Sequence, residues 1–295
     1  MKLAFKVDVD TYLGTKIGVP SLSRLFLREN IKASFFFTLG EDEMGRSISR
    51  VFKKGFLRKC AKSNVLGNYP IRTLLHGTLL PAPIISKRCS EVIASVANGG
   101  FECGVHCWNH YRWQNFLLDM SEADVAKELA RAFDWLKSIC GEGVSSFASA
   151  GWQVSENHLS FLDSFGVLYA SDSRGKYPFY PIFKGRKFKT MQIPTTLPTL
   201  DEILCDKSPT DAADWYVEQI CSSDISVMTI HAELEGCSHF EWFEEFVLRL
   251  KGKGVEFIAL QDYARSVMNS SLLPECEIVM SEFPNRSGLI AVQKG

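Results

Sequence analysis

The 295-residue sequence lacks several features that would assign it to a class of protein at once. It has no run of about 18 apolar residues, the length that a transmembrane helix needs. Its first residues, MKLAFKVDVD, contain no apolar signal segment and no cleavage site. Its nine cysteines form no C-x-x-C pair and no regular framework. These absences predict a cytoplasmic protein with reduced thiols that is neither exported nor embedded in a membrane.

Acidic residues are missing from one long segment, residues 44–90. This segment carries ten positive charges among large apolar residues, and the whole-chain charge of −1 leaves −11 for the remainder. A mixture of cations and apolar bulk suits an anionic membrane surface, although a solvated helical excursion with clustered cations is the alternative. We expect no nucleic-acid binding, because the acidic remainder would repel it. The ten cations are Arg46, Arg50, Lys53, Lys54, Arg58, Lys59, Lys62, Arg72, Lys87 and Arg88.

Apolar periodicity alternates between strand and helix along the rest of the chain, with no Pro/Gly/Ser-rich linker. Strands are expected at 3–9, 32–39, 101–106, 145–150, 167–172, 191–194, 226–232 and 256–260, and helices at 20–31, 88–98, 121–139, 155–165, 210–222 and 239–251. This pattern predicts an α/β fold, a single distorted (β/α) barrel of about seven or eight strands over residues 1–265. Residues 44–90 would be an inserted helical segment and 266–295 a C-terminal extension. A doubly wound open sheet is the alternative, but no G-x-G-x-x-G motif follows any strand to support it.

Polar side chains and one Gly-Trp pair stand at the carboxyl ends of the expected strands. In a (β/α) barrel these ends converge on one mouth, so groups more than 200 residues apart in sequence would meet there. The residues concerned are Asp8 and Asp10 after the first strand, His106 in the third, Gly151 and Trp152 after the fourth, Asp172 and Arg174 after the fifth, and His231 in the seventh.

The stretch HCWNH places His106 and His110 four positions apart. Two imidazoles and a carboxylate, with open positions for water, are the ligands of a catalytic divalent metal site. The histidines can face one ion only if the residues between them form a helical turn. Each part alone has an ordinary explanation, because a single histidine is more often a core residue and D-x-D is more often a solvated strand end. A thiolate site using Cys103 and Cys107 is a weaker alternative.

Five short strings, DVD, HCWNH, AGW, SDSRG and TIHAE, occur in an order that resembles the motifs of the polysaccharide deacetylase family. The resemblance implies the distorted barrel of the NodB-homology domain. The longer strings VDVDTYLGTKIGVP, QIPTTLPT and TIHAELEGC are similar to those of bacterial deformylases that act on undecaprenyl-phosphate-linked 4-formamido-arabinose. The similarity spans about residues 3–265.

The resemblance implies a role for each matching residue. Asp8 would be the general base and His231 the proton donor, while Asp10, His106 and His110 would hold a divalent ion, either Zn, Mn, Co, Ni or Fe. Contacts to the substrate are expected from Trp152, Asp172, Arg174 and Glu233. Two features depart from the family pattern: Val9 separates the aspartates, and the Arg-x-Pro motif is absent at SAGWQ. Arg174 is our candidate for the missing guanidinium that orients the base.

The activity implied is hydrolysis of the formamide, which releases formate and a free amino sugar for lipid A modification and resistance to cationic antimicrobial peptides. The partners would be the undecaprenyl-phosphate-linked N-acyl amino sugar and the anionic inner-membrane surface, which the protein would contact peripherally from the cytoplasm. One alternative is a deacetylase of a carrier-linked N-acetylhexosamine, because a pocket distinguishes one methyl group by only about 1–3 kcal/mol. The other is a non-catalytic barrel that binds glycolipid at the membrane.

Overall fold

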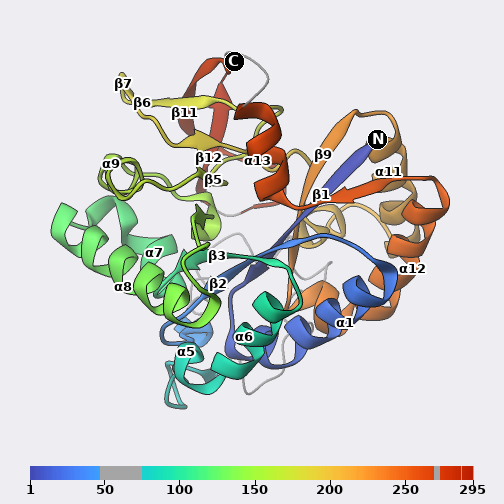
Figure 1. Cartoon of the computed structure of the whole chain (residues 1–295), viewed down its shortest axis with the longest axis horizontal. Coiled ribbons are helices and arrows are strands. Elements are labelled where there is room, and N and C mark those ends of the chain that lie inside the picture. Colours follow the sequence, from blue (N-terminus) through green and yellow to red (C-terminus); the bar gives the residue numbers. More distant parts are fainter. Residues whose placement is uncertain (47–74, 269–272, 287, 295) are drawn as a thin grey trace.

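The computed structural model describes residues 1–46, 75–268, 273–286 and 288–294 (Figure 1). Residues 47–74, the greater part of the expected membrane-contact segment, lie outside the described residues. Seven of its ten cations fall in that part, so its contact with a membrane stays a prediction. Among the described helices, none is long and apolar enough to cross a membrane.

A curled, parallel sheet forms the centre of the molecule (Figure 1). Its strands follow the order β10-β1-β2-β3-β4-β5-β8, and β9 also pairs with β1. One edge of β1 pairs with β9 along residues 2–8. The opposite edge pairs first with β10, along residues 2–4, and then with β2, along residues 6–9. Their bounds are β1 Lys2–Val9, β2 Ser34–Thr38, β3 Glu102–Cys107, β4 Ser146–Phe147, β5 Tyr169–Ala170, β8 Met191–Gln192, β9 Ile225–His231 and β10 Glu256–Ile258.

The segment after β8 brings the sheet round toward a barrel. The amide of Thr196 donates to the carbonyl of Val227 in β9 at 3.0 Å, and the hydroxyl groups of Thr195 and Thr229 lie 2.8 Å apart. The predicted distorted barrel is therefore confirmed, and each of the eight expected strands corresponds to a strand of this sheet.

Helices cover the outside of the curled sheet (Figure 1). Helix α8 illustrates why they form: the side chain of Ser121 caps its first turn by accepting from the amide of Asp124, and apolar residues recur at helical spacing along its buried face. The helices are α1 Val19–Glu29, α5 Ile85–Arg88, α6 Ser90–Asn98, α7 His110–Phe116, α8 Glu122–Cys140, α9 Glu156–Phe165, α10 Leu200–Ile203, α11 Pro209–Cys221, α12 Phe240–Gly252 and α13 Leu260–Met268. Short 3-10 or π-helical turns occupy Gly14–Gly18, Leu117–Asp119, Ala150–Trp152 and Leu234–Ser238.

Strand β1 carries apolar residues on one face and charged residues on the other. Phe5 packs in the core between the sheet and the helices, with ring contacts to Phe26 and Phe243. Side chains alternate along a strand, so Lys6 and Asp8 point to the opposite face, the barrel interior. Both are buried, and this face leads to the mouth of the barrel.

A second sheet of four strands, ordered β12-β11-β6-β7, lies beside the barrel (Figure 1). Sequence analysis missed it: β6 (Tyr180–Phe183) and β7 (Arg186–Lys187) are short, and β11 (Glu275–Glu282) and β12 (Leu289–Lys294) belong to the C-terminal extension. The β11–β12 hairpin is attached to the barrel at Arg174, whose amide donates to the carbonyl of Ala291 and whose carbonyl accepts from the amide of Gln293.

Candidate metal-dependent active site

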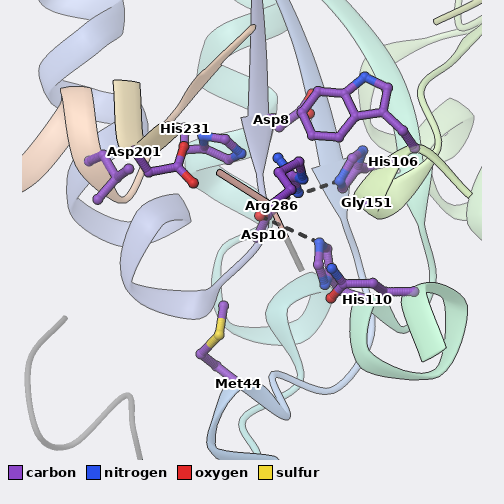
Figure 2. A pocket seen from close by; sticks show the side chains of 12 residues that line it. Asp8, Asp10, Met44, His106, His110, Gly151, Asp201, His231 and Arg286 are labelled. Atoms are coloured by element: carbon purple, nitrogen blue, oxygen red, sulfur yellow. Dashed lines mark ion pairs between the residues drawn. The ribbon is translucent and has the colours of Figure 1, made fainter. Parts of the chain in front are cut away.

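Three metal-ligand side chains meet at the mouth of the barrel (Figure 2). Asp10 follows β1, His106 lies in β3 and His110 is the first residue of α7. The Nε2 atoms of His106 and His110 lie 3.2 and 3.4 Å from the two oxygens of Asp10. One donor atom from each residue falls within 4.8 Å of the others.

The connection between the two histidines differs from the helical turn that we expected. The chain bends at Trp108, and Asn109 is extended (φ −120°, ψ 108°) before α7 begins. The side chain of Asn109 fixes this path, because it accepts from the amide of Arg112 at 2.8 Å and donates to Glu43 at 2.9 Å. The prediction of a helical turn was therefore wrong, although the imidazole rings still approach to 5.5 Å between centroids.

The donor set fits a divalent cation. Two imidazole nitrogens and one carboxylate, with space left on the pocket side, are the ligands of catalytic Zn and related sites. Burial lowers the pKa of His110, an effect that the Asp10 carboxylate only partly offsets, so this imidazole favours the neutral, ligating form.

The carboxylate of Asp8 is held by a buried lysine. The Nζ of Lys6 donates to Oδ2 of Asp8 at 2.7 Å, and the two side chains are 0% and 4% exposed. Burial lowers the pKa of Lys6, an effect that Asp8 partly offsets. Oδ1 of Asp8 has no hydrogen-bond partner among the described residues, and Asp8 lines the pocket. One oxygen is thus fixed and the other is available to the pocket.

We had expected Arg174 to be the cation that pairs with the base, and this expectation was wrong. Its guanidinium donates to Glu202 at 2.6 Å and to the carbonyl of Leu197 at 2.7 Å, and it lines a different cavity. The cation on Asp8 is Lys6, two residues earlier on the same face of β1.

His231, the last residue of β9, stands on the other side of the pocket near Asp201 (Figure 2). Its amide donates to Glu235 at 2.9 Å. Burial lowers the pKa of the imidazole, but the carboxylates of Asp10, Asp201 and Glu235 outweigh burial and raise it overall. His231 is therefore suited to carry a proton at neutral pH.

The pocket between these groups has a volume of about 150 Å³. It brings together seven residues that the sequence singled out for the barrel mouth, namely Asp8, Asp10, His106, His110, Gly151, Trp152 and His231. Its other lining residues are Met44, Gln114, Asp201, Leu234 and Arg286. A larger cavity of about 560 Å³ beside Arg174 contains no comparable set of ligands among the described residues.

Asp172 and Glu233 lie outside the pocket lining, with their carboxylates engaged by the protein. Asp172 is fully buried and accepts from the amide of Ser149 at 2.9 Å, next to the turn that carries Trp152. Glu233 accepts from the amides of Asp10 and Thr11 at 2.9 and 2.7 Å. Burial raises the pKa of Glu233 to about 8, with a contribution from Asp10. These contacts favour positioning of the site over the substrate contact that we expected from both residues.

Sequence reasoning missed several charged residues of this region, among them Lys6, Asp201 and Arg286. Lys6 could have been found, because strand alternation places it on the same face as Asp8. Asp201 and Arg286 carried no such signal: Asp201 lies in a short helix between strands, and Arg286 lies in the turn of the C-terminal hairpin.

Comparison with known proteins gives concordant results. The profile of the polysaccharide deacetylase family matches residues 13–170. A probable 4-deoxy-4-formamido-L-arabinose-phosphoundecaprenol deformylase, ArnD, from Shewanella sediminis is 37% identical over 262 residues, 88% of this chain and 84% of that protein. Its counterpart from Wigglesworthia glossinidia brevipalpis is 34% identical over 285 residues, 96% and 99% of the two chains. A crystal structure assigned to a Mycobacterium smegmatis polysaccharide deacetylase superposes with a TM-score of 0.64 at 17% identity, covering 96% and 94% of the chains.

Proposed function

The chain belongs to the polysaccharide deacetylase family, and from this premise we propose that it hydrolyses the formamide of an undecaprenyl-phosphate-linked 4-formamido-arabinose. The products are formate and the free amino sugar, which serves lipid A modification and resistance to cationic antimicrobial peptides. The observation that carries the proposal is the meeting of one metal-ligand triad, one lysine-paired carboxylate and one imidazole around a single pocket. A binding module would need no such combination, which disfavours the non-catalytic alternative.

Asp10, His106 and His110 would hold the divalent ion. When bound, such an ion supplies a Lewis acid that polarises an amide carbonyl and makes a nearby water more acidic. Nitrogen and oxygen donors accept Zn, Mn, Co, Ni or Fe, so the donor set leaves the identity of the metal open.

The remaining groups handle the protons. Asp8 takes a proton from the attacking water through its available oxygen, while Lys6 holds the other oxygen in place. His231 donates a proton to the departing sugar nitrogen, because an amine leaves poorly as an anion. Asp201 and Glu235 favour the protonated imidazole that this step requires.

The formyl substrate is preferred over acetyl because the two ArnD relatives align over most of the chain. Discrimination against one additional methyl group would still be modest, about 1–3 kcal/mol.

A prenyl phosphate tail keeps the substrate in the membrane, so the enzyme must work at the bilayer surface. The acid-free segment 44–90 provides the cations for this contact, and each lysine or arginine near an anionic leaflet contributes about 1 kcal/mol. We therefore place the enzyme peripherally on the cytoplasmic face of the inner membrane.

The test is turnover of matched carrier lipids by purified enzyme loaded with each candidate metal. We expect formate release from the formamido-arabinose lipid and slower acetate release from the matched acetamido lipid. Release of acetate alone would favour the deacetylase alternative. Release of neither by metal-loaded enzyme would favour the non-catalytic one.

A further inference from the structure

The C-terminal hairpin contributes an arginine to the active-site pocket. Arg286 lies in the turn between β11 and β12 and lines the cavity that contains the metal-ligand triad (Figure 2). It is the only lysine or arginine among the described lining residues. The family profile ends at residue 170, so it does not extend to this hairpin.

The turn that carries Arg286 is anchored to the barrel at several points. The side chain of Asn285 donates to the carbonyl of Glu202 at 3.0 Å, and Gln153 donates to the carbonyl of Leu289 at 2.8 Å. The guanidinium carbon of Arg286 lies 4.4 Å from the ring centroid of Trp152. Cation–π contact and backbone anchoring therefore hold the guanidinium at the pocket wall.

Arg286 shares its only side-chain hydrogen-bond acceptor among the described residues, Glu202, with Arg174. One oxygen of Glu202 accepts from Arg174 at 2.6 Å and from Arg286 at 3.0 Å. A single carboxylate can neutralise only one of these two guanidinium groups. A second carboxylate, Asp201, faces both guanidinium groups and also His231, so its charge is shared among these groups, while Lys6 is bound to Asp8.

Geometry distinguishes the two arginines of this cluster. Arg174 is 2% exposed, while the side chain of Arg286 is 16% exposed and lines the pocket. Among the described residues, the hydrogen bonds of the Arg286 guanidinium go to Glu202 alone, through one of its nitrogens. The other donors of the planar fork are available to a ligand, and this fork matches a phosphate well.

We propose that Arg286 binds the phosphate that links the sugar to its lipid carrier. This inference rests on the proposed function, in which the formamide occupies carbon 4 and the phosphate the anomeric carbon of one sugar ring. When the formamide reaches the metal triad, the phosphate lies one ring away across a pocket of about 150 Å³. A guanidinium in the wall of so small a pocket is within reach of that group.

The experiment compares two substrates that differ only in the phosphate. One is the formamido-arabinose joined through phosphate to a short prenyl chain, and the other is the short alkyl glycoside of the same sugar. Arg286→Gln should lower kcat/KM for the phosphodiester roughly 10- to 100-fold, the usual effect of losing a charge-assisted hydrogen bond, and change the glycoside less than about 3-fold. Arg286→Lys should recover part of the loss, because it restores the charge without the fork.

Two further variants, one of them a control, test whether the effect is specific to the position of the Arg286 guanidinium. Arg186→Gln removes an exposed arginine that also stacks on an aromatic ring, that of Phe188, and should leave both substrates unaffected, because neither residue lines the pocket. Asn285→Gly loosens the hairpin anchor at a residue whose φ of +61° suits glycine. Because this anchor holds the guanidinium at the pocket wall, the variant should lower kcat/KM for the phosphodiester more than for the glycoside, but less than Arg286→Gln does. An equal loss on both substrates in Arg286→Gln, or no loss on either, would overturn the proposal.

A binding measurement keeps this inference distinct from the proposed function. Calorimetric titration of the phosphodiester into Asp8→Asn enzyme, with and without Arg286→Gln, does not depend on turnover. Weaker binding without Arg286 supports the phosphate contact, and an unchanged Kd overturns it even if the parent enzyme is an active deformylase. Failure of the parent to hydrolyse either formamide would instead reject the proposed function.

Discussion

Replacing Lys6 by methionine should separate the general base from the metal site. Lys6 is fully buried, and its Nζ lies 2.7 Å from Oδ2 of Asp8. The variant Lys6→Met keeps the apolar stem but removes the charge. It leaves the Asp8 carboxylate buried without a counter-charge, and a carboxylate in that position is more readily protonated and so less able to act as a base.

The expected loss of unfolding free energy follows from the burial of the Lys6–Asp8 ion pair. Removing one partner of a buried ion pair typically costs about 3–5 kcal/mol of unfolding free energy. Asp8 also lines the pocket, where water can solvate its free oxygen, so we expect a smaller loss of about 2–4 kcal/mol. We expect kcat to fall by roughly 100-fold or more, in the range of lost general base catalysis, and KM to change little.

The assay combines turnover, bound metal and denaturant unfolding. Metal content should stay at the parent level, because neither Lys6 nor Asp8 belongs to the ligand triad. The double variant Lys6→Met/Asp8→Asn should unfold at higher denaturant than Lys6→Met, because a neutral amide then replaces the unpaired carboxylate. Lys2→Met is the matched control on the same strand, since its contact with Glu256 is 3.6 Å long and half exposed and should contribute less than about 1 kcal/mol.

Two results would refute this reasoning. A kcat for Lys6→Met close to that of the parent would show that the base needs no cation. If Lys6→Met lost metal in proportion to activity, Lys6 would be needed to keep the metal-ligand triad in place. In that case Lys6→Arg, which keeps the charge in a larger side chain, should also lose both metal and activity.

The remaining predictions concern the other groups of the mechanism and the membrane contact. Asp8→Asn should retain metal, measured by elemental analysis, and lose nearly all turnover, whereas Asp10→Asn should lose both. Equal metal loss in the two variants would contradict the assignment of Asp8 as base and Asp10 as metal ligand. His231→Ala should keep its metal and lower kcat far more than it raises KM, and an unchanged kcat would remove it as proton donor. Replacing four cations of the 44–90 segment by serine should weaken co-sedimentation with anionic vesicles by a few kcal/mol at low salt, and by less at high salt, while turnover of a short-chain soluble analogue stays unchanged. The four residues are Lys53, Lys54, Arg58 and Lys59. The prediction would be contradicted if the variant sedimented with vesicles like the parent, or if it lost turnover equally on the lipid and the soluble substrates.

The sequence predicted the barrel well because local periodicity and strand order carry that information. The expected strand at 3–9 is β1 at Lys2–Val9, and the expected helix at 121–139 is α8 at Glu122–Cys140. The second sheet was missed because β6 and β7 are short, and because β6 pairs with β11, which lies almost 100 residues later. Such pairing depends on tertiary contact, which no local pattern reveals.

The candidate site, too, was predicted only in part from the sequence. His106 and Asp10 were found because a barrel brings the carboxyl ends of its strands together, and the motif strings identified the rest of the triad. The partner of Asp8 was assigned to Arg174 by analogy with the family, but Glu202 already engages that guanidinium. Strand alternation would have indicated Lys6 as the partner of Asp8, whereas the contact of Arg174 with Glu202 depends on tertiary packing, which no local pattern reveals.

The arrangement separates hydrolysis from substrate recognition along the chain. The groups that would cleave the amide come from the strands of the parallel sheet and from the start of α7. The groups that would bind the phosphate and the bilayer come from additions to that sheet, the β11–β12 hairpin and the 44–90 segment. Arg286 is not a ligand of the triad, so a family member with the same strand-end residues but no arginine at the hairpin turn should hydrolyse amides without needing a phosphate. The variant Arg286→Gln tests this directly. Its kcat/KM should be nearly the same for the phosphodiester and the alkyl glycoside, and its turnover of the glycoside should persist.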